Sequence, residues 1–209
     1  HSGSIDLSQA KKSTGIFMTK GTLNSSGNIS VNEGSVGVNA EDSTVNVNGG
    51  THTIGANSIG FNLKGNSSKL LANSGNILIT GKGSVAYLFE GVNLASGTNF
   101  KDNLSLSSTK SYTYINADTS RLNYRNTKVI ANDDSMFINA KDSYVTLLAG
   151  TDISSTNKDV KVIYSESGYV YNHGTLSLTG DKSAALYGKN SSISNELSGK
   201  ITVGKDGSG

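Results

Sequence analysis

The feature that most constrains how this chain can fold is a phrase that recurs every 22 to 27 residues. A copy alternates polar with aliphatic residues and leads into a second alternating run, as at 27–40. Full or partial copies occur at 3–18, 27–40, 50–63, 75–89, 103–117, 127–140, 150–164, 174–188 and 199–209. Self-similarity at such a period is typical of a solenoid, in which each repeat forms one turn of a stack.

A small polar residue in each copy sets the alignment of the turns. These anchors are Ser13, Ser35, Ser58, Ser84, Ser111, Ser135, Asp159, Ser183 and Ser208. After each anchor the residues alternate with a period of two, which indicates a half-buried β-strand. The first expected inward column contains Val36, Ile59, Val85, Tyr112, Met136, Val160 and Ala184. The second contains Ile16, Val38, Phe61, Tyr87, Tyr114, Ile138, Val162 and Leu186. The small residues that stand between the two columns are Gly15, Gly37, Gly60, Ala86 and Ala185.

Two more strands are expected in each copy. One precedes the anchor and carries an aliphatic pair, such as Ile29 and Val31 or Leu176 and Leu178. The other follows a polar turn after the anchor strand, as in 143–147. Three short strands and three turns in about 24 residues describe one coil, so the sequence predicts an all-β parallel β-helix of about eight coils. Leucine-rich repeats have a similar period, but their L-x-x-L-x-L-x-x-N frame is missing.

Composition supports a stack of strands and excludes several classes of function. The 209 residues include no Pro, which suits strands that need every backbone N–H for ladder bonds. They include no Cys, so disulfides, thiol chemistry and Cys-based metal sites are excluded. The net charge of +2, with scattered Lys and Arg, gives no footprint for nucleic acid. No apolar run is long enough to span a bilayer, so we do not expect this segment to insert directly into a membrane.

One elongated domain is expected. Residues 5–207 form the single β-helix segment, residues 1–4 resemble a cloning scar that leads into the first coil, and residues 208–209 are the chain end. We expect a monomer that is a piece of a longer rod, because neither terminal coil shows a polar cap over its unpaired strands.

Coils of 22 to 27 residues, in which G-x-[IVL]-x-[IVL] leads into S-x-G-[VFY], resemble the passenger domains of bacterial autotransporters, the type V secretion class. The Asn-, Ser- and Lys-rich, Pro-free sequence is most similar to the large fusobacterial autotransporter adhesins, and the resemblance covers residues 3–207. It implies a right-handed β-helix displayed on the outer membrane surface by a C-terminal barrel, which is not in this sequence. It also implies a host glycan, a host cell-surface receptor or a partner bacterium as the ligand.

The polar residues give little support for catalysis or metal binding. Parallel β-helices include polysaccharide-degrading enzymes, whose sites need several carboxylates in one groove with Arg or Lys beside them. The carboxylates here fall in turns, where solvation of the turn is their expected role. Stacked in register, Asp118, Asp142 and Glu166 would form an acidic column of the kind that suits Ca²⁺. His52 and His173 lie about five coils apart, so we expect no zinc site, no catalytic residue and no cofactor.

Tyrosines give the best lead to a binding site. The tyrosines expected in the core are Tyr112, Tyr114 and Tyr164. Tyr144, Tyr169 and Tyr171 fall at outward positions of the third strand on successive coils. An exposed Tyr offers an apolar ring and a hydroxyl for recognition of sugar or protein, although it is also a good strand former. We expect these three residues to bind the ligand.

Three functions remain open. The favoured one is a non-catalytic adhesin segment at the bacterial cell surface, which attaches to host cells or other bacteria through a glycan or a protein receptor. The alternatives are an inert β-helical stalk and a polysaccharide-degrading β-helix enzyme. Modest insertions around 66–69 and 93–103 are where a protruding loop is expected.

Overall fold

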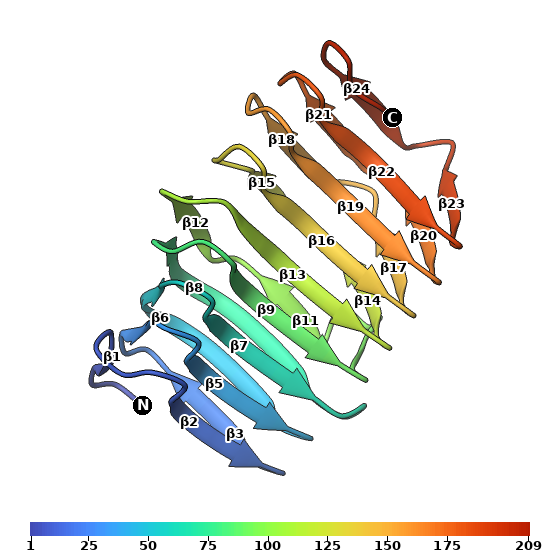
Figure 1. Cartoon of the computed structure of the whole chain (residues 1–209). Coiled ribbons are helices and arrows are strands. Elements are labelled where there is room, and N and C mark those ends of the chain that lie inside the picture. The colour runs from blue at the N-terminus through green and yellow to red at the C-terminus, as the bar shows by residue number, and fades with distance from the viewer.

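The computed structural model describes all 209 residues and contains 24 β-strands and no helix. Strands pair in parallel from one coil to the next and form four sheets around a common axis, as Figure 1 shows. The predicted all-β parallel β-helix of about eight coils is therefore confirmed. No helix is present that is long and apolar enough to cross a membrane.

The front sheet contains one strand from each coil and faces the viewer in Figure 1. Its strands are β2 (Thr14–Thr19), β5 (Val36–Glu41), β7 (Ile59–Lys64), β9 (Ser84–Glu90), β13 (Tyr112–Asp118), β16 (Met136–Lys141), β19 (Lys161–Glu166) and β22 (Ala184–Lys189). They run from upper left to lower right while successive coils advance toward the upper right, which is the sense of a right-handed helix (Figure 1).

The remaining faces differ between the two halves of the molecule. In the N-terminal half they form one sheet, the N-half sheet, of β1 (Ile5–Leu7), β3 (Thr22–Ser25), β4 (Ile29–Val31), β6 (Thr44–Ile54), β8 (Lys69–Ile79), β11 (Phe100–Asp102) and β12 (Ser105–Ser108). In the C-terminal half there are two sheets. The side sheet contains β10 (Asn93–Leu94), β14 (Arg121–Tyr124), β17 (Tyr144–Leu147), β20 (Tyr169–Asn172) and β23 (Ser192–Asn195). The back sheet contains β15 (Thr127–Val129), β18 (Asp152–Ser155), β21 (Thr175–Leu178) and β24 (Lys200–Val203).

Strands β6 and β8 are each 11 residues long. Each takes the place of two separate short strands of the later coils. The ladder between them is irregular from Val47 to Thr51, next to Gly50, which has a positive φ of 84°. A Cβ added at Gly50 would lie 2.2 Å from the carbonyl oxygen of Gly27 in the coil below. Three strands per coil were expected throughout, and the first coil (β1 to β3) and the C-terminal half have them. In β6 and β8 two of the expected strands join into one, because glycine lets the chain bend at that point without leaving the ladder.

The corner after each front strand is built from one left-handed residue followed, in several coils, by a buried serine. The left-handed residues are Lys20, Asp42, Gly65, Gly91, Thr119, Asp142, Ser167 and Asn190. Ser120 Oγ donates to the carbonyl of Asp118 at 2.8 Å and accepts the N–H of Val92 at 3.1 Å. One coil further on, Ser143 Oγ donates to the carbonyl of Lys141 at 2.7 Å and accepts the N–H of Ser120 at 3.0 Å. Serines thus satisfy backbone groups that the turn leaves without a ladder partner.

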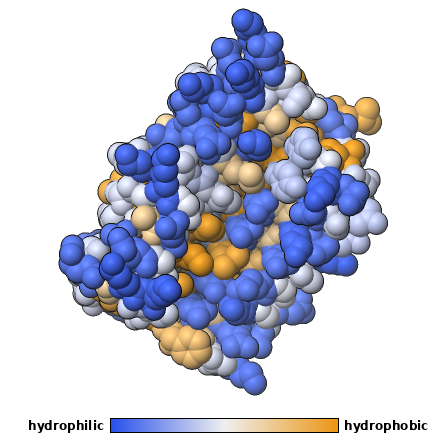
Figure 2. All heavy atoms as spheres, viewed as in Figure 1, coloured by the Kyte–Doolittle hydropathy of each residue, from blue (hydrophilic) through white to orange (hydrophobic).

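The core is one cluster of 41 buried hydrophobic residues, but the first expected inward column is largely wrong. Five of its members, Val36, Ile59, Val85, Met136 and Ala184, are only half-buried and belong to the outer face of the front sheet. The residues buried in their place are Gly37, Gly60, Ala86, Phe137 and Ala185. Two consecutive residues face inward in each of these strands, so a strict period of two fails at that point. Figure 2 shows the outer face, with apolar side chains gathered near its middle between polar margins.

The anchors expected at Ser111 and Asp159 are wrong by one residue. Tyr112 pairs with Ser84, so Tyr112 occupies the anchor position, and Val160 occupies it in its own coil. Because of this shift, Tyr114 and Val162 do not lie in the second inward column where they were expected. Both are nevertheless buried. Five anchors are buried, which was not predicted; they are Ser35, Ser58, Ser84, Ser135 and Ser183.

Candidate functional site

Three exposed tyrosines and one arginine lie together on the outer face of the side sheet. Tyr144, Tyr169 and Tyr171 are 45%, 42% and 38% exposed. The rings of Tyr144 and Tyr169 stack with centroids 4.7 Å apart and an interplanar angle of 13°. The guanidinium carbon of Arg121 lies 5.0 Å from the centre of the Tyr144 ring. We call these four residues the tyrosine platform.

The strand register positions the platform. Arg121, Tyr144 and Tyr169 are direct partners in neighbouring coils, and the spacing of their rings matches the roughly 4.8 Å between paired strands. Val145 and Val170 are buried on the other side of the same strands. The outward position expected for the three tyrosines is confirmed. Tyr171 differs in one respect, because it lies on the same coil as Tyr169 and not on a third one.

A second tyrosine stack lies on the front sheet. Tyr164 and Tyr187 have ring centroids 5.4 Å apart at an interplanar angle of 12°, and Tyr187 is 51% exposed. The core position expected for Tyr164 is therefore wrong. The cause is the one-residue shift of the Asp159 anchor, which places Tyr164 opposite Asn139 on the outer face.

The alternative acidic column of Asp118, Asp142 and Glu166 does not form. Asp118 pairs with Lys141, Lys141 with Glu166, and Glu166 with Lys189, so charges of opposite sign alternate along the edge of the front sheet. The carboxylate of Glu166 lies 2.7 Å from Lys189 Nζ, and the hydrogen bond from Lys189 lowers the pKa of Glu166. Asp142 lies in the left-handed corner and not in this column. No group of three or more His, Cys, Asp or Glu side chains is placed to hold a metal ion.

The most concentrated chemistry in the molecule lies inside the core. The carboxylate of Asp102 accepts hydrogen bonds from the hydroxyls of Tyr87 at 3.0 Å, Tyr114 at 2.8 Å and Tyr124 at 2.9 Å. Lys128 Nζ lies 3.4 Å from the same carboxylate and donates to the carbonyl of Leu104. The side chains of Asp102 and Lys128 are only 1% and 6% exposed. We call Asp102, Lys128 and the three tyrosines the buried cluster.

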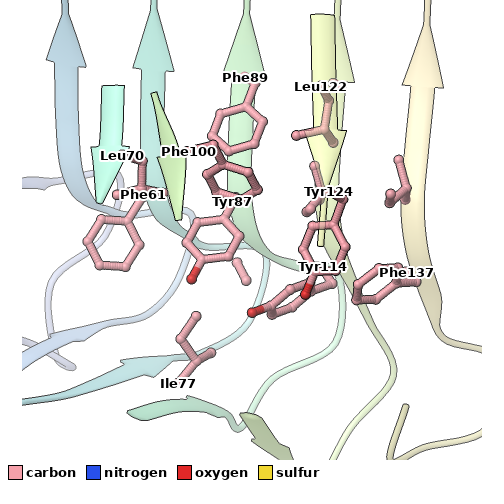
Figure 3. Packing of buried hydrophobic residues seen from close by; sticks show 14 of the residues in the cluster. Phe61, Leu70, Ile77, Tyr87, Phe89, Phe100, Tyr114, Leu122, Tyr124 and Phe137 are labelled. Carbon is pink, nitrogen blue, oxygen red and sulfur yellow. The ribbon is translucent and has the colours of Figure 1, made fainter. Parts of the chain in front are cut away.

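The aromatic rings around the buried cluster pack on one another, as Figure 3 shows. The ring of Tyr114 stacks on Phe137 at 5.2 Å and meets Tyr87 edge-on at 5.2 Å. Burial raises the pKa of the Tyr87, Tyr114 and Tyr124 hydroxyls well above the usual value of 10, and the nearby charge of Asp102 raises it further. These hydroxyls therefore stay protonated and serve as donors to Asp102.

The buried cluster was not predicted from the sequence, although the position of Lys128 in the repeat indicates it. Lys128 pairs with Ile153, so it occupies a row of the back sheet that continues as Leu176 and Ile201. A charged residue at an aliphatic position of a repeat indicates a buried partner. The partner, Asp102, lies in the insertion at 93–103, where the repeat gives no alignment.

A hollow opens to solvent where the sheets change partners. β10 pairs with β14, whereas β11 of the same coil pairs back to β8, so no ladder joins β11 to β14. The resulting hollow has a volume of about 380 Å³. Its lining residues are Gly97, Phe100, Lys101, Asp102, Asn103, Asn123, Tyr124, Arg125 and Leu148. This is the region where the sequence predicted a protruding loop, and residues 95–98 are exposed.

In comparisons with known proteins, no family model, no curated protein and no solved structure matches this chain.

Proposed function

We propose that this chain is a non-catalytic segment of a bacterial surface adhesin, displayed at the outer membrane, and that it binds a glycan or a protein receptor on host cells or other bacteria. The observation that carries the proposal is the tyrosine platform. Tyr144 and Tyr169 expose stacked rings to solvent, with Arg121 at one end of the row.

Such a platform suits recognition for physical reasons. A tyrosine ring presents a broad apolar face that loses little conformational freedom on binding, and its hydroxyl forms directed hydrogen bonds. Arginine adds a planar charged donor, and it is enriched with tyrosine at the centres of binding surfaces. The platform lies on strands and not on loops, so the geometry is held by the ladders of β14, β17 and β20.

The burial of Asp102 favours binding over catalysis. A polysaccharide-degrading enzyme needs carboxylates that reach the substrate. Asp102 lies in the buried cluster together with a lysine and tyrosines, and its carboxylate is already bonded to three hydroxyls. A role as an inert stalk is the second candidate, because the coils stack regularly on both sides of the loop at 95–99.

Glycan-array and receptor-panel binding tests the proposal. The wild-type chain is compared with Tyr144→Ser/Tyr169→Ser/Tyr171→Ser, which we expect to lose binding at least tenfold while its melting temperature is unchanged. Tyr187→Ser, at an equally exposed tyrosine of the front sheet, is the matched control. Retention of full binding by the triple variant would exclude the platform, and a wild-type chain that binds nothing would indicate the stalk.

A further inference from the structure

Two cations at the hollow between β11 and β14 have no anionic partner. Lys101 and Arg125 line the hollow, both are exposed, and neither takes part in any of the four ion pairs of the protein. The only carboxylate in the lining belongs to Asp102, which faces the core and is compensated there by Lys128. The hollow therefore presents uncompensated positive charge on a chain whose net charge is only +2.

Amides and apolar groups complete the lining. Asn123 Nδ2 donates to the carbonyl of Ala95, which leaves its own carbonyl oxygen free, and the side chain of Asn103 has no hydrogen-bond partner. Phe100 and Leu148 supply apolar surface. Cations suit a carboxylate, amides suit hydroxyl groups, and apolar walls suit the C–H face of a sugar ring.

The size and position of the hollow fit one residue of a longer glycan. Its volume of about 380 Å³ lies at the lower end of the roughly 300–1,000 Å³ of small-molecule sites. Asn123 pairs with Thr146, and Thr146 pairs with Tyr171. Two strand spacings, about 10 Å, therefore separate Asn123 from Tyr171 of the tyrosine platform, a distance that an oligosaccharide spans.

We infer that the hollow binds a sugar residue that bears a carboxylate, a sialic or a uronic acid, while the rest of the glycan lies over the tyrosine platform. The inference rests on the proposed adhesin function and names its ligand class. Lys101 and Arg125 bind the carboxylate, Asn103 and Asn123 bind hydroxyl groups, and Phe100 contacts the ring.

The test is an NMR titration of the ¹⁵N-labelled chain with three methyl glycosides: those of N-acetylneuraminic acid, glucuronic acid and glucose. One or both acidic sugars should shift the amide resonances of Lys101, Asn103 and Arg125, with an affinity that falls as salt is added. The neutral glucoside should not. The comparison of the two acids distinguishes a sialic acid from a uronic acid.

Charge reversal sharpens the test. Lys101→Glu/Arg125→Glu should weaken binding of the acidic sugar at least tenfold. Lys158→Glu/Lys182→Glu changes the net charge equally at two exposed lysines outside the hollow, and it should leave the affinity unchanged. Circular dichroism should show the same melting temperature for both variants, because all four side chains are exposed.

Three results would overturn the inference: equal binding of the neutral glucoside, full binding by Lys101→Glu/Arg125→Glu, or no shift at the hollow with either acid at millimolar concentration. The proposed function fails separately. Neutral glycans that bind wild type but not the platform triple variant would support the adhesin and contradict the acidic hollow. Acidic sugars that still shift the hollow resonances in the triple variant would support the hollow alone.

Discussion

The two halves of the rod bury side chains of different chemistry. In β6 and β8 the inward residues are aliphatic, such as Val45, Leu70 and Ile77, and His52 is the single exception. From β9 to β16 the interior instead contains aromatic rings, together with Asp102 and Lys128. The rings labelled in Figure 3 from this region are Tyr87, Phe89, Phe100, Tyr114, Tyr124 and Phe137. In the aliphatic half, β6 and β8 each form one long strand. In the aromatic half, each coil has two shorter strands at the same place, one in the side sheet and one in the back sheet, with a loop between them.

The contrast indicates how a solenoid changes its cross-section. Where the long edge of β8 gives way to β14 and β15, the coil between them divides its pairing, because β10 joins the side sheet and β11 the N-half sheet. Large rings fill the interior at this transition, and three of them carry hydroxyls that need an acceptor away from water. Asp102 supplies the acceptor and Lys128 compensates its charge.

Removal of Asp102 should have the largest effect. Asp102→Ala leaves Lys128 buried without its partner and three hydroxyls without an acceptor, so we expect a loss of about 3–5 kcal/mol in the free energy of unfolding, measured with urea. Lys128→Met added to Asp102→Ala should restore part of that loss, because no buried charge remains. Losses that simply add in the double variant would contradict the assigned ion pair.

His52 should make the aliphatic half sensitive to acid. The side chain is buried between Ile29 and Ile77 of the neighbouring coils, neither ring nitrogen has a partner, and burial lowers its pKa to about 4. The unfolded chain takes up a proton near pH 6.5, and the folded chain does so only near pH 4. The stability due to the neutral ring is therefore complete above pH 6.5 and is lost as the pH falls from 6.5 to 4, by about 3 kcal/mol.

Urea denaturation between pH 4 and 7 checks the role of His52. His52→Ile matches the row in which it lies and should flatten the pH dependence by that amount. His173→Gln, which removes the half-exposed histidine in the loop after β20, is the control and should leave the slope as in wild type. Equal slopes in wild type and His52→Ile would exclude His52 as the acid-sensitive group.

The sequence predicted the architecture because each coil repeats the same physical task. A Ser at the anchor and an apolar residue three positions later, as in Ser35–Val38 and Ser58–Phe61, are buried in both coils. The outward tyrosines of β17 and β20 followed from alternation alone. The repeat could not predict where alternation is interrupted, as at Val36, since burial of the adjacent Gly37 depends on the path of the strand.

The candidate site was only half predictable for a related reason. Tyr144 and Tyr169 are repeat positions, so their alignment could be derived from the spacing. Asp102 lies in the insertion, and its partners come from four different strands, which only the folded chain brings together. The hollow arises from the exchange of partners between β10 and β11, which no local pattern encodes.

The corners of the two halves can be compared by a pair of glycine substitutions. Gly50 and Gly150 have similar φ values of 84° and 88°, but an added Cβ would meet the Gly27 carbonyl at 2.2 Å in the first case and nothing within 4 Å in the second. Gly150→Ala should cost about 1–2 kcal/mol from backbone strain alone. Gly50→Ala adds the clash and should cost measurably more. Equal melting temperatures would indicate that the corner of β6 is as free as the later loop.

The smallest effect on stability is expected for the ion pair between Glu166 and Lys189, which lies at the surface and not in the core. Glu166 and Lys189 approach to 2.7 Å, closer than Asp102 and Lys128, yet their side chains are 35% and 58% exposed. Water solvates both charges after the pair is broken, so Glu166→Gln should leave the free energy of unfolding at physiological salt unchanged within error. Urea denaturation of Glu166→Gln beside Asp102→Ala makes the comparison directly. If Glu166→Gln lowered the free energy of unfolding as much as Asp102→Ala does, burial would not be the reason that the core pair stabilises the protein. The role assigned to Asp102 and Lys128 in the aromatic half would then be wrong.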